Sequence, residues 1–362
     1  MGLNSFQTSG NSPGRTRCRI GLLGFGALGA AVAARLTDQA ALPSLELAHI
    51  FDRRAHDKRA RLPEGSPLDR LTWTDRSDDL LTSDVDVIVE ASARTEPVVD
   101  VVRASLLTGK SVVTANEQVI AHHGPSLLAL AERQGRQVRF EAAVGGAMPI
   151  VRAVAEGLAG DHIRSIDAIL NSTTNLVLSR LEAAGGTLED LVAEACAAGY
   201  AQADPSVDLS GADAAAKLSI LCFCAFGVRI LPTQIETRGI ANVDENAFRK
   251  ARLAGGTIRQ IARARFDHDR RSLVAFVAPI VVPQTSIFAR TVGAENAASV
   301  VTAHAGVVTM SGLGGGAEAT AAAMLGDLVA IARDRAAIVP APVLSEPVEI
   351  RGLAEARFAE AV

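Results

Sequence analysis

Aromatic residues are scarce in this sequence: Phe, Trp and Tyr make up only 4% of its 362 residues. Proteins that bind single-stranded nucleic acids stack the bases on aromatic side chains, and nucleic-acid binding in general favours an excess of positive charge. This chain has 36 Lys and Arg against 40 Asp and Glu, which gives a formal net charge of −4. The composition therefore argues against a nucleic-acid partner and against binding to an anionic membrane surface.

Long apolar runs and cysteine pairs are also missing. No stretch is apolar over the roughly 20 residues that a membrane-spanning helix needs. Residues 1–16 are polar and lack the apolar segment of a secretion signal, so we expect them to form a disordered tail. Four cysteines without a Cys-x-x-Cys pair predict reduced, mostly buried thiols in a cytoplasmic protein: Cys18, Cys196, Cys222 and Cys224.

The first part of the chain alternates between strand-like and helix-like segments. This alternation predicts an α/β fold with a doubly wound parallel sheet, a Rossmann fold, over residues 17–148. The expected strands are residues 18–23, 45–51, 85–90, 110–114 and 138–142. The expected helices are one that ends at Leu36 and two over residues 97–107 and 125–134.

The pattern changes after residue 148, where we predict a mixed α+β domain for substrate binding and dimerisation over 149–318. Its expected strands are 163–170, 272–282 and 300–310, and its expected helices are 149–158, 176–184, 187–198, 211–226 and 246–264. The last segment, 319–362, is expected to hold an alanine-rich helix (320–333) that returns to the first domain. A mostly irregular tail should follow it.

A Gly-x-Gly-x-x-Gly sequence follows the first strand and opens the first helix. In this context it predicts a dinucleotide site. Gly24 permits the tight turn, Gly26 lets backbone N–H groups approach a pyrophosphate, and Gly29 lets the helix pack closely on the strand. A glycine-rich turn without a ligand is the alternative. The predicted loop comprises Gly24, Phe25, Gly26, Ala27, Leu28 and Gly29.

The end of the second strand bears on the choice between NAD and NADP. Asp52 stands where a carboxylate would bind the ribose hydroxyls of NAD. Arg53 and Arg54 follow at once, and Lys58 and Arg59 are close, so a 2′-phosphate could also be held. The position of Asp52 favours NAD, and these cations leave NADP open.

Lys217 lies in an apolar run that predicts a buried helix. Burying an ammonium group is costly unless it is paired or used in chemistry. Asp213 precedes it by one helical turn, and Asp204 and Asp208 lie just upstream. Two interpretations remain open. One is a functional lysine, and the other is a structural ion pair whose lysine stem reaches toward solvent.

Further landmarks extend over nearly the whole chain, from Ile20 to about Arg333, and together they resemble the homoserine dehydrogenase family. In chain order they are Gly24–Gly29, Val87–Glu90, Val113–Asn116, Glu141–Gly146, Asn171–Asn175, Gly199–Tyr200, Asp204–Pro205, Asp208–Asp213 with Lys217, and Gly312–Gly316 ahead of Thr320.

The resemblance implies roles for individual residues. Lys217 would exchange the hydroxyl proton, and Asp213 would position it or tune its pKa. The implied substrate residues are Thr173, Tyr200, Asp208, Glu117 and Gln202. The implied cofactor residues beyond the glycine loop are Asp52, Arg53, Ala91, Ser92, Ala115, Asn116, Gly314 and Gly315. The resemblance also implies a homodimer and an Na⁺ or K⁺ site at Glu141, Val144 and Gly146.

Two positions depart from the family pattern. The family sequence Thr-Ala-Asn-Lys reads Thr-Ala-Asn-Glu here, with Glu117 in place of the lysine, and the glutamate that binds the substrate ammonium is replaced by Gln202. We therefore predict an NAD(P)-dependent oxidoreductase with altered specificity, acting on a small hydroxy acid or amino alcohol. The alternatives are an authentic homoserine dehydrogenase, which interconverts L-homoserine and L-aspartate 4-semialdehyde, and a catalytically silent nucleotide-binding protein.

Overall fold

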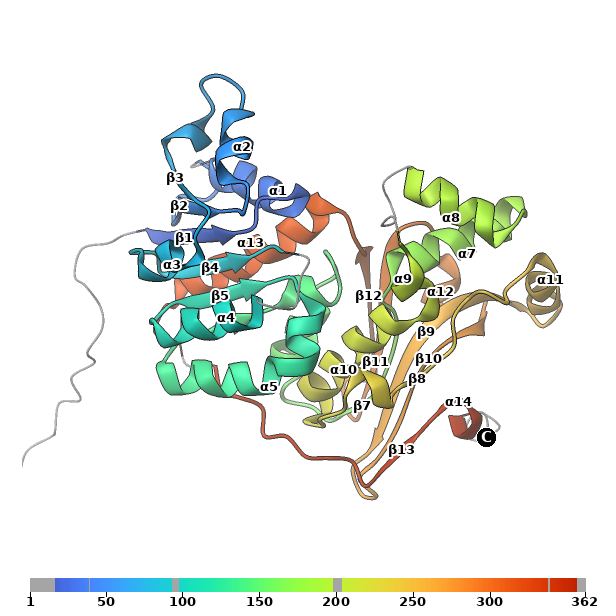
Figure 1. Ribbon diagram of the computed structural model, residues 1–362. Helices are drawn as coiled ribbons and strands as arrows, with labels where there is room; N and C mark the ends of the chain where they lie inside the picture. Colours follow the sequence, from blue (N-terminus) through green and yellow to red (C-terminus); the bar gives the residue numbers. More distant parts are fainter. Residues whose placement is uncertain (1–16, 39, 93–97, 198–203, 338, 357–362) are drawn as a thin grey trace, which may run out of the picture.

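The computed structural model describes residues 17–38, 40–92, 98–197, 204–337 and 339–356. These residues form two sheets with helices packed around them (Figure 1). The tail predicted over 1–16 lies outside the described residues.

The first sheet is six-stranded and parallel, with the strand order β3-β2-β1-β4-β5-β6. This is the order of a Rossmann fold, so the predicted fold class is confirmed. Its strands are β1 (Cys18–Leu23), β2 (Leu45–Phe51), β3 (Thr72–Thr74), β4 (Val87–Glu90), β5 (Ser111–Thr114) and β6 (Val138–Arg139). Its helices are α1 (Ala27–Leu36), α2 (Ala55–Ala60), α3 (Ser77–Thr82), α4 (Val98–Leu107) and α5 (Glu117–Gln134).

The second sheet is mixed, with the order β12-β11-β7-β9-β10-β13, and β8 pairs with β10. Its strands are β7 (Ile163–Ile169), β8 (Glu236–Thr237), β9 (Gly256–Asp267), β10 (Ser272–Pro283), β11 (Glu295–Thr302), β12 (Val307–Leu313) and β13 (Glu349–Arg351). The helices around it are α6 (Ile150–Arg152), α7 (Ser172–Ala184), α8 (Leu188–Ala197), α9 (Ser206–Ser210), α10 (Ala212–Phe226), α11 (Glu245–Leu253), α12 (Ile287–Arg290) and α14 (Leu353–Ala356).

Helix α13 (Ala317–Arg333) returns to the first sheet and packs against α1, as the alanine-rich pattern predicted (Figure 1). The described residues after α13 are mostly irregular, as expected, with two short elements, β13 and α14, near their end. The segment runs back to the second sheet, where β13 pairs in parallel with β10 and Leu353 donates its backbone N–H to Glu236. This segment therefore connects the two sheets. The domain boundaries predicted from the sequence stay a prediction.

Three predictions of local structure were wrong. Residues 246–264 form α11 and then the first part of β9, because Gly255 adopts a left-handed conformation (φ +76°) that ends the helix. Residues 300–310 span the antiparallel strands β11 and β12, which reverse at Gly306. The predicted strand over 138–142 ends at Arg139 and gives way to a short 3₁₀ helix over Glu141–Ala143.

Helix α5 also begins earlier than predicted. Asn116 caps it by accepting the backbone N–H of Val119, and Pro125 is tolerated inside the helix. The segment predicted as a helix over 149–158 consists of α6 followed by a π-helical turn, Ala153–Gly157. The early start of α5 matters for the site because it makes Glu117 the first residue of the helix.

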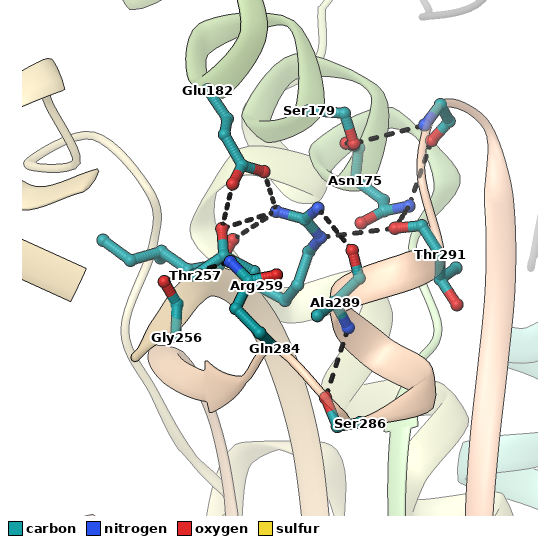
Figure 2. A network of polar contacts seen from close by, with 12 residues as sticks. Asn175, Ser179, Glu182, Gly256, Thr257, Arg259, Gln284, Ser286, Ala289 and Thr291 are labelled. Atoms are coloured by element: carbon teal, nitrogen blue, oxygen red, sulfur yellow. Dashed lines mark hydrogen bonds and ion pairs between the residues drawn. The ribbon is translucent and has the colours of Figure 1, made fainter. Parts of the chain in front are cut away.

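A buried arginine connects three segments of the second sheet and its helices (Figure 2). Arg259 of β9 is only 1% exposed and forms an ion pair with Glu182 of α7 at 2.8 Å. Its guanidinium group also donates to the carbonyl oxygens of Ala289 and Thr291. Asn175 of α7 binds the same loop through the carbonyl of Thr291. These contacts fix α7, whose first residues enter the candidate site.

Candidate active site

The glycine loop joins β1 to α1 and forms one wall of a cavity of about 510 Å³. Gly24 takes a positive φ of +100°, and a Cβ on Gly29 would lie 2.0 Å from the carbonyl oxygen of Gly24. A Cβ on Gly26 would meet nothing within 4 Å, so this glycine faces open space. Of the predicted cofactor residues, these line the cavity: Gly24, Gly26, Ala27, Leu28, Asp52, Arg53, Ala91 and Ser92.

These features fit a dinucleotide. The space over Gly26 lies at the N-terminus of α1, where unpaired backbone N–H groups and the helix dipole favour a pyrophosphate. Gly29 serves packing, as predicted, because its missing side chain lets α1 approach the loop. Phe25 does not line the cavity and packs its ring edge-on against Trp73 at 4.8 Å.

Asp52 stands at the end of β2, as predicted, but its carboxylate is already engaged. Lys58 Nζ lies 2.5 Å from Asp52 Oδ2 and also donates to the carbonyl oxygen of Phe25. The backbone N–H groups of Phe25 and Arg54 donate to the same carboxylate. Burial raises the pKa of Asp52, but these hydrogen bonds outweigh it and lower the pKa overall. Lys58 lines the cavity, so it faces the ribose side of the site.

A buried glutamate lies at the end of β4, between the cofactor loop and α5. Glu90 accepts hydrogen bonds from the backbone N–H and hydroxyl of Ser92 and from the hydroxyl of Thr114. The hydroxyl oxygen of Thr114 in turn accepts the backbone N–H of Asn116. Burial raises the pKa of Glu90 despite these donors. Glu90 is not among the site residues that we predicted from the sequence.

Lys217 and Asp213 form an ion pair at 2.9 Å on successive turns of α10. Lys217 Nζ also donates to the carbonyl oxygen of Leu170 at 3.1 Å, and its side chain keeps 15% exposure. Burial lowers the pKa of Lys217, but the carboxylates of Asp213 and Glu117 outweigh it and raise the pKa overall. The ammonium form is therefore favoured, and two of its three N–H groups are engaged.

Asn171 organises the acidic residues around this lysine. Its side-chain amide donates to Asp208 at 2.7 Å and to Asp213 at 2.8 Å. Its side-chain oxygen accepts the backbone N–H of Thr174 and so caps α7. Thr173, which we predicted to bind the substrate, also forms a hydrogen bond with Asp208 through its side chain. The sequence Asn171-Ser172-Thr173-Thr174 has the pattern of a helix N-terminus. This pattern is the signal in the sequence that could have identified Asn171 as a capping residue at the site.

Glu117 brings a further carboxyl group to the same place. It is the first residue of α5, is partly buried, and interacts electrostatically with Asp213 and Lys217 of α10 and with Glu90 of β4. Burial is the largest influence on its pKa, followed by Asp213, and both raise it. The structure thus brings the predicted residues Glu117, Asp213 and Lys217 together at the junction of the two sheets.

Gly314 and Gly315 lie where the chain crosses from β12 to α13. A Cβ on Gly314 would clash with the side chain of Asn296, and one on Gly315 would lie 2.8 Å from Ser172 Oγ. Gly146 packs against Gly314 in the same way. These glycines adjoin the start of α7 and do not line the cavity at the glycine loop. Ala115 and Asn116 lie at the end of β5, next to Glu117.

Glu141, the predicted cation ligand, has a different set of partners. Its carboxylate accepts the backbone N–H groups of Val151 and Arg152, and its own N–H donates to Asp327. Burial raises its pKa to about 7. Among the described residues, no group of three or more His, Cys, Asp or Glu side chains is placed to hold a metal ion. The Na⁺ or K⁺ site with Val144 and Gly146 stays a prediction.

Tyr200 and Gln202 lie outside the described residues. Within the described ranges, none of the helices is both long and apolar enough to cross a membrane. The cytoplasmic location predicted from the cysteines stays a prediction.

Comparison with known proteins gives one family over both parts of the chain. Residues 24–141 match the NAD binding domain of homoserine dehydrogenase, and residues 149–329 match the homoserine dehydrogenase domain that accompanies it. Homoserine dehydrogenase from Mycobacterium tuberculosis is 36% identical over 308 residues, which cover 83% of this chain and 70% of that protein. The enzyme from Corynebacterium glutamicum is 35% identical over 334 residues, which cover 90% and 74%.

Similar solved structures come from the same family. The crystal structure of a homoserine dehydrogenase from Thiobacillus denitrificans superposes with a TM-score of 0.85 at 32% identity and covers 92% of this chain and 80% of its own. A putative homoserine dehydrogenase from Archaeoglobus fulgidus gives a TM-score of 0.76 at 32% identity, with coverage of 87% and 99%.

Proposed function

This chain belongs to the homoserine dehydrogenase family, and we propose that it interconverts L-homoserine and L-aspartate 4-semialdehyde. As a member it is an NAD(P)-dependent oxidoreductase that acts on a CH–OH group. The observation that carries the proposal is the Lys217–Asp213 pair, held by Asn171 at the junction between the nucleotide-binding sheet and the second sheet. The altered specificity predicted from the sequence is not confirmed, because relatives at about 35% identity are named homoserine dehydrogenase.

The residues of this chain can perform most of the steps of an alcohol oxidation. A nicotinamide cofactor, when bound, supplies the hydride acceptor. The glycine loop and the N-terminus of α1 would hold its pyrophosphate, and Asn116 and Ala115 would lie beside its reactive end. Lys217 has one N–H group beyond its bonds to Asp213 and Leu170. That group can donate to the reacting oxygen of the substrate and stabilise the charge that develops there.

Lys217 and Asp213 act as a unit in this proposal. The carboxylate of Asp213 holds the ammonium group in place, and Asn171 holds Asp213. Asp208 and Thr173 lie next to this unit and would contact the polar end of the substrate. Tyr200 and Gln202 are proposed to complete the substrate site.

The cofactor site can accept either NAD or NADP. An unpaired Asp52 would bind the ribose hydroxyls of NAD and repel the 2′-phosphate of NADP. In this structure Lys58 neutralises that carboxylate, and Arg53 lines the same cavity. We therefore propose that the enzyme uses both cofactors, which replaces the preference for NAD that Asp52 alone suggested.

Turnover assays with purified protein test the proposed function. NAD⁺ and NADP⁺ reduction is followed with L-homoserine and with a panel of hydroxy acids and amino alcohols. Turnover of L-homoserine at the highest kcat/KM of the panel supports the proposal. A higher kcat/KM for another alcohol would contradict it and would favour the second candidate, an altered substrate, for which the exchange at Glu117 is the specific observation.

We also propose a homodimer through the second sheet. Helices α7 and α10 pack against one face of that sheet. The opposite face is partly or fully exposed in the described structure along β7, β11 and β12, at Ser165, Asp167, Ser299, Val301, Val307 and Thr309. A second copy could cover this face by stacking sheet on sheet. Light scattering after size-exclusion chromatography should give twice the chain mass of 37.6 kDa, and a monomer mass would contradict the proposal.

A further inference from the structure

The charges around Lys217 bear on which group takes the proton of the reacting hydroxyl. The carboxyl groups of Asp213, Glu117 and Asp208 all favour the charged form of this amine. An ammonium group donates hydrogen bonds but cannot accept a proton. Lys217 is therefore well suited to hold the substrate oxygen and poorly suited to take the proton from it.

Glu117 is the group placed to take the proton of the reacting hydroxyl. It stands at the first position of α5, directly after Asn116 at the end of β5, and so on the cofactor side of the Lys217–Asp213 pair. The neighbouring carboxyl groups are committed. Asp213 and Asp208 accept hydrogen bonds from Asn171, and Glu90 accepts three from Ser92 and Thr114.

The carboxyl group of Glu117 has weaker hydrogen bonds than these neighbouring carboxyl groups. The carboxyl group of Glu117 accepts hydrogen bonds only from its own chain segment: a long one, 3.5 Å, from the amide of Gln118, and one from the backbone N–H of Glu117 itself, as far as the described residues show. Glu117 is partly buried, and it interacts electrostatically with Lys217, whose described ion pair is with Asp213. Glu117 is therefore less engaged than the other carboxyl groups around Lys217.

We propose that Glu117 is the proton acceptor in alcohol oxidation, and that Lys217 remains charged and binds the substrate oxygen. This inference rests on the proposed function. The carbinol carbon gives up its hydrogen with both bonding electrons to the nicotinamide. The O–H bond breaks, its proton goes to the carboxylate of Glu117, and its electron pair forms the new C=O bond. Glu117 then releases the proton to water, and in the reverse direction it donates one.

The surroundings of Glu117 suit this exchange. Burial and Asp213 raise its pKa above that of an ordinary glutamate and so bring it closer to neutral pH, where a general base works best. Glu90 adds negative charge from β4, and Lys217 opposes the rise from α10. Because oxidation needs the carboxylate, its rate should rise with pH through this pKa. Aldehyde reduction needs the carboxylic acid and should fall over the same range.

The test compares Glu117→Gln with wild type and with Glu132→Gln, a control at the exposed far end of the same helix. We expect Glu117→Gln to lower kcat for oxidation by about 100-fold or more, with the Kd of the cofactor unchanged. The acidic limb of the pH–kcat profile should disappear. Formate should restore part of the rate in Glu117→Ala. A kcat within threefold of wild type, or an unchanged acidic limb, overturns the inference.

Two further readouts distinguish a binding role of Glu117 from a failure of the proposed function. If Glu117 instead anchors the ammonium group of the substrate, Glu117→Gln raises KM and leaves the kcat profile intact, which also overturns the inference. If wild type oxidises no alcohol in the panel, the proposed function fails, and the inference fails with it. If wild type is active, Glu117 is followed by NMR in ¹³C-labelled, NAD⁺-bound enzyme. A titration midpoint of Glu117 that rises in Lys217→Met supports the inference, and a midpoint that does not move overturns it.

Discussion

Asp213 Oδ2 lies 2.9 Å from Lys217 Nζ, one turn earlier on α10, and this pair is the chemical centre of the site. The carboxylate is held by Asn171 from the start of α7, so the position of the ammonium group depends on contacts between two helices. Removing Asp213 or Lys217 should therefore lower the rate of catalysis more strongly than it weakens cofactor binding.

Substitutions in this pair should separate chemistry from binding. Lys217→Met should lower kcat by about 10²- to 10⁴-fold, because the reacting oxygen loses its charged donor. Asp213→Asn should lower kcat less, because the lysine remains. The Kd of NADH, measured by fluorescence, should stay within a few-fold of wild type in both variants. Lys217→Arg keeps the charge and controls for folding. Equal kcat values in Lys217→Met and wild type would contradict the assignment.

Local spacing explains why this part of the site could be predicted from the sequence. The glycine loop and the Asp213–Lys217 pair are each contained in one short segment, so their geometry follows from a turn or a helix. The strand β9 could not be predicted in this way. Its buried residues include Arg259 and Arg263, whose partners Glu182 and Asp167 come from other elements. A charged residue looks like a surface residue until its partner is known.

The same limit applies to Glu90 and Lys58. Glu90 reads as the last residue of an apolar strand, and only the fold brings Ser92 and Thr114 to its carboxylate. Lys58 reads as one of several cations in a solvated loop, and only the fold pairs it with Asp52. In each case the missing information is the contact between segments, which neither periodicity nor composition contains.

Lys58→Met should shift the cofactor preference toward NAD. Without its partner, Asp52 becomes an unpaired carboxylate at the ribose side of the cavity and repels a 2′-phosphate. We expect KM for NADP⁺ to rise about 10-fold or more and KM for NAD⁺ to change less. Arg59→Met is the matched control, because Arg59 is half-exposed and pairs with Asp69 outside the cavity. A parallel change in both KM values would argue against this role.

The buried arginine in Figure 2 should be important for stability. Arg259→Met takes the ion-pair partner away from Glu182 and removes the charged donor to the carbonyl oxygens of Ile258, Ala289 and Thr291, which should cost about 3–5 kcal/mol. Urea unfolding measures the loss. The double variant Arg259→Met/Glu182→Leu should lose less than the sum of the single variants, because no unpaired charge remains. Arg249→Met, on the exposed side of α11, should be nearly neutral. Additive losses would mean that the two side chains are not coupled.

Stability should also depend on pH through Glu141. Its pKa is about 7 in the folded protein against 4.5 for an ordinary glutamate. Between these values the folded protein keeps a proton that the unfolded chain has lost, so stability falls as pH rises through this window. The full effect is about 3 kcal/mol. Urea midpoints measured from pH 4.5 to 7.5 should therefore fall more steeply for wild type than for Glu141→Gln. Parallel curves would show that Glu141 does not titrate there.

Gly26 and Gly29 should give opposite results when replaced by alanine. A methyl group on Gly29 would lie 2.0 Å from the carbonyl oxygen of Gly24, so Gly29→Ala must displace α1 and should lower the thermal midpoint of the free protein. A methyl group on Gly26 would meet no protein atom within 4 Å, and the φ of this residue, −85°, suits alanine. The free Gly26→Ala protein should therefore unfold at the temperature of wild type.

The cofactor should distinguish the two variants again. The methyl group of Gly26→Ala would occupy the space that the structure leaves for the pyrophosphate at the N-terminus of α1, so the Kd of NAD(P)H should rise about 10-fold or more, a loss of at least about 1.4 kcal/mol. Thermal shifts with and without cofactor measure both effects on one sample. If the cofactor stabilises Gly26→Ala as much as it stabilises wild type, the pyrophosphate binds elsewhere. The open space over Gly26 is the feature on which this position of the pyrophosphate depends.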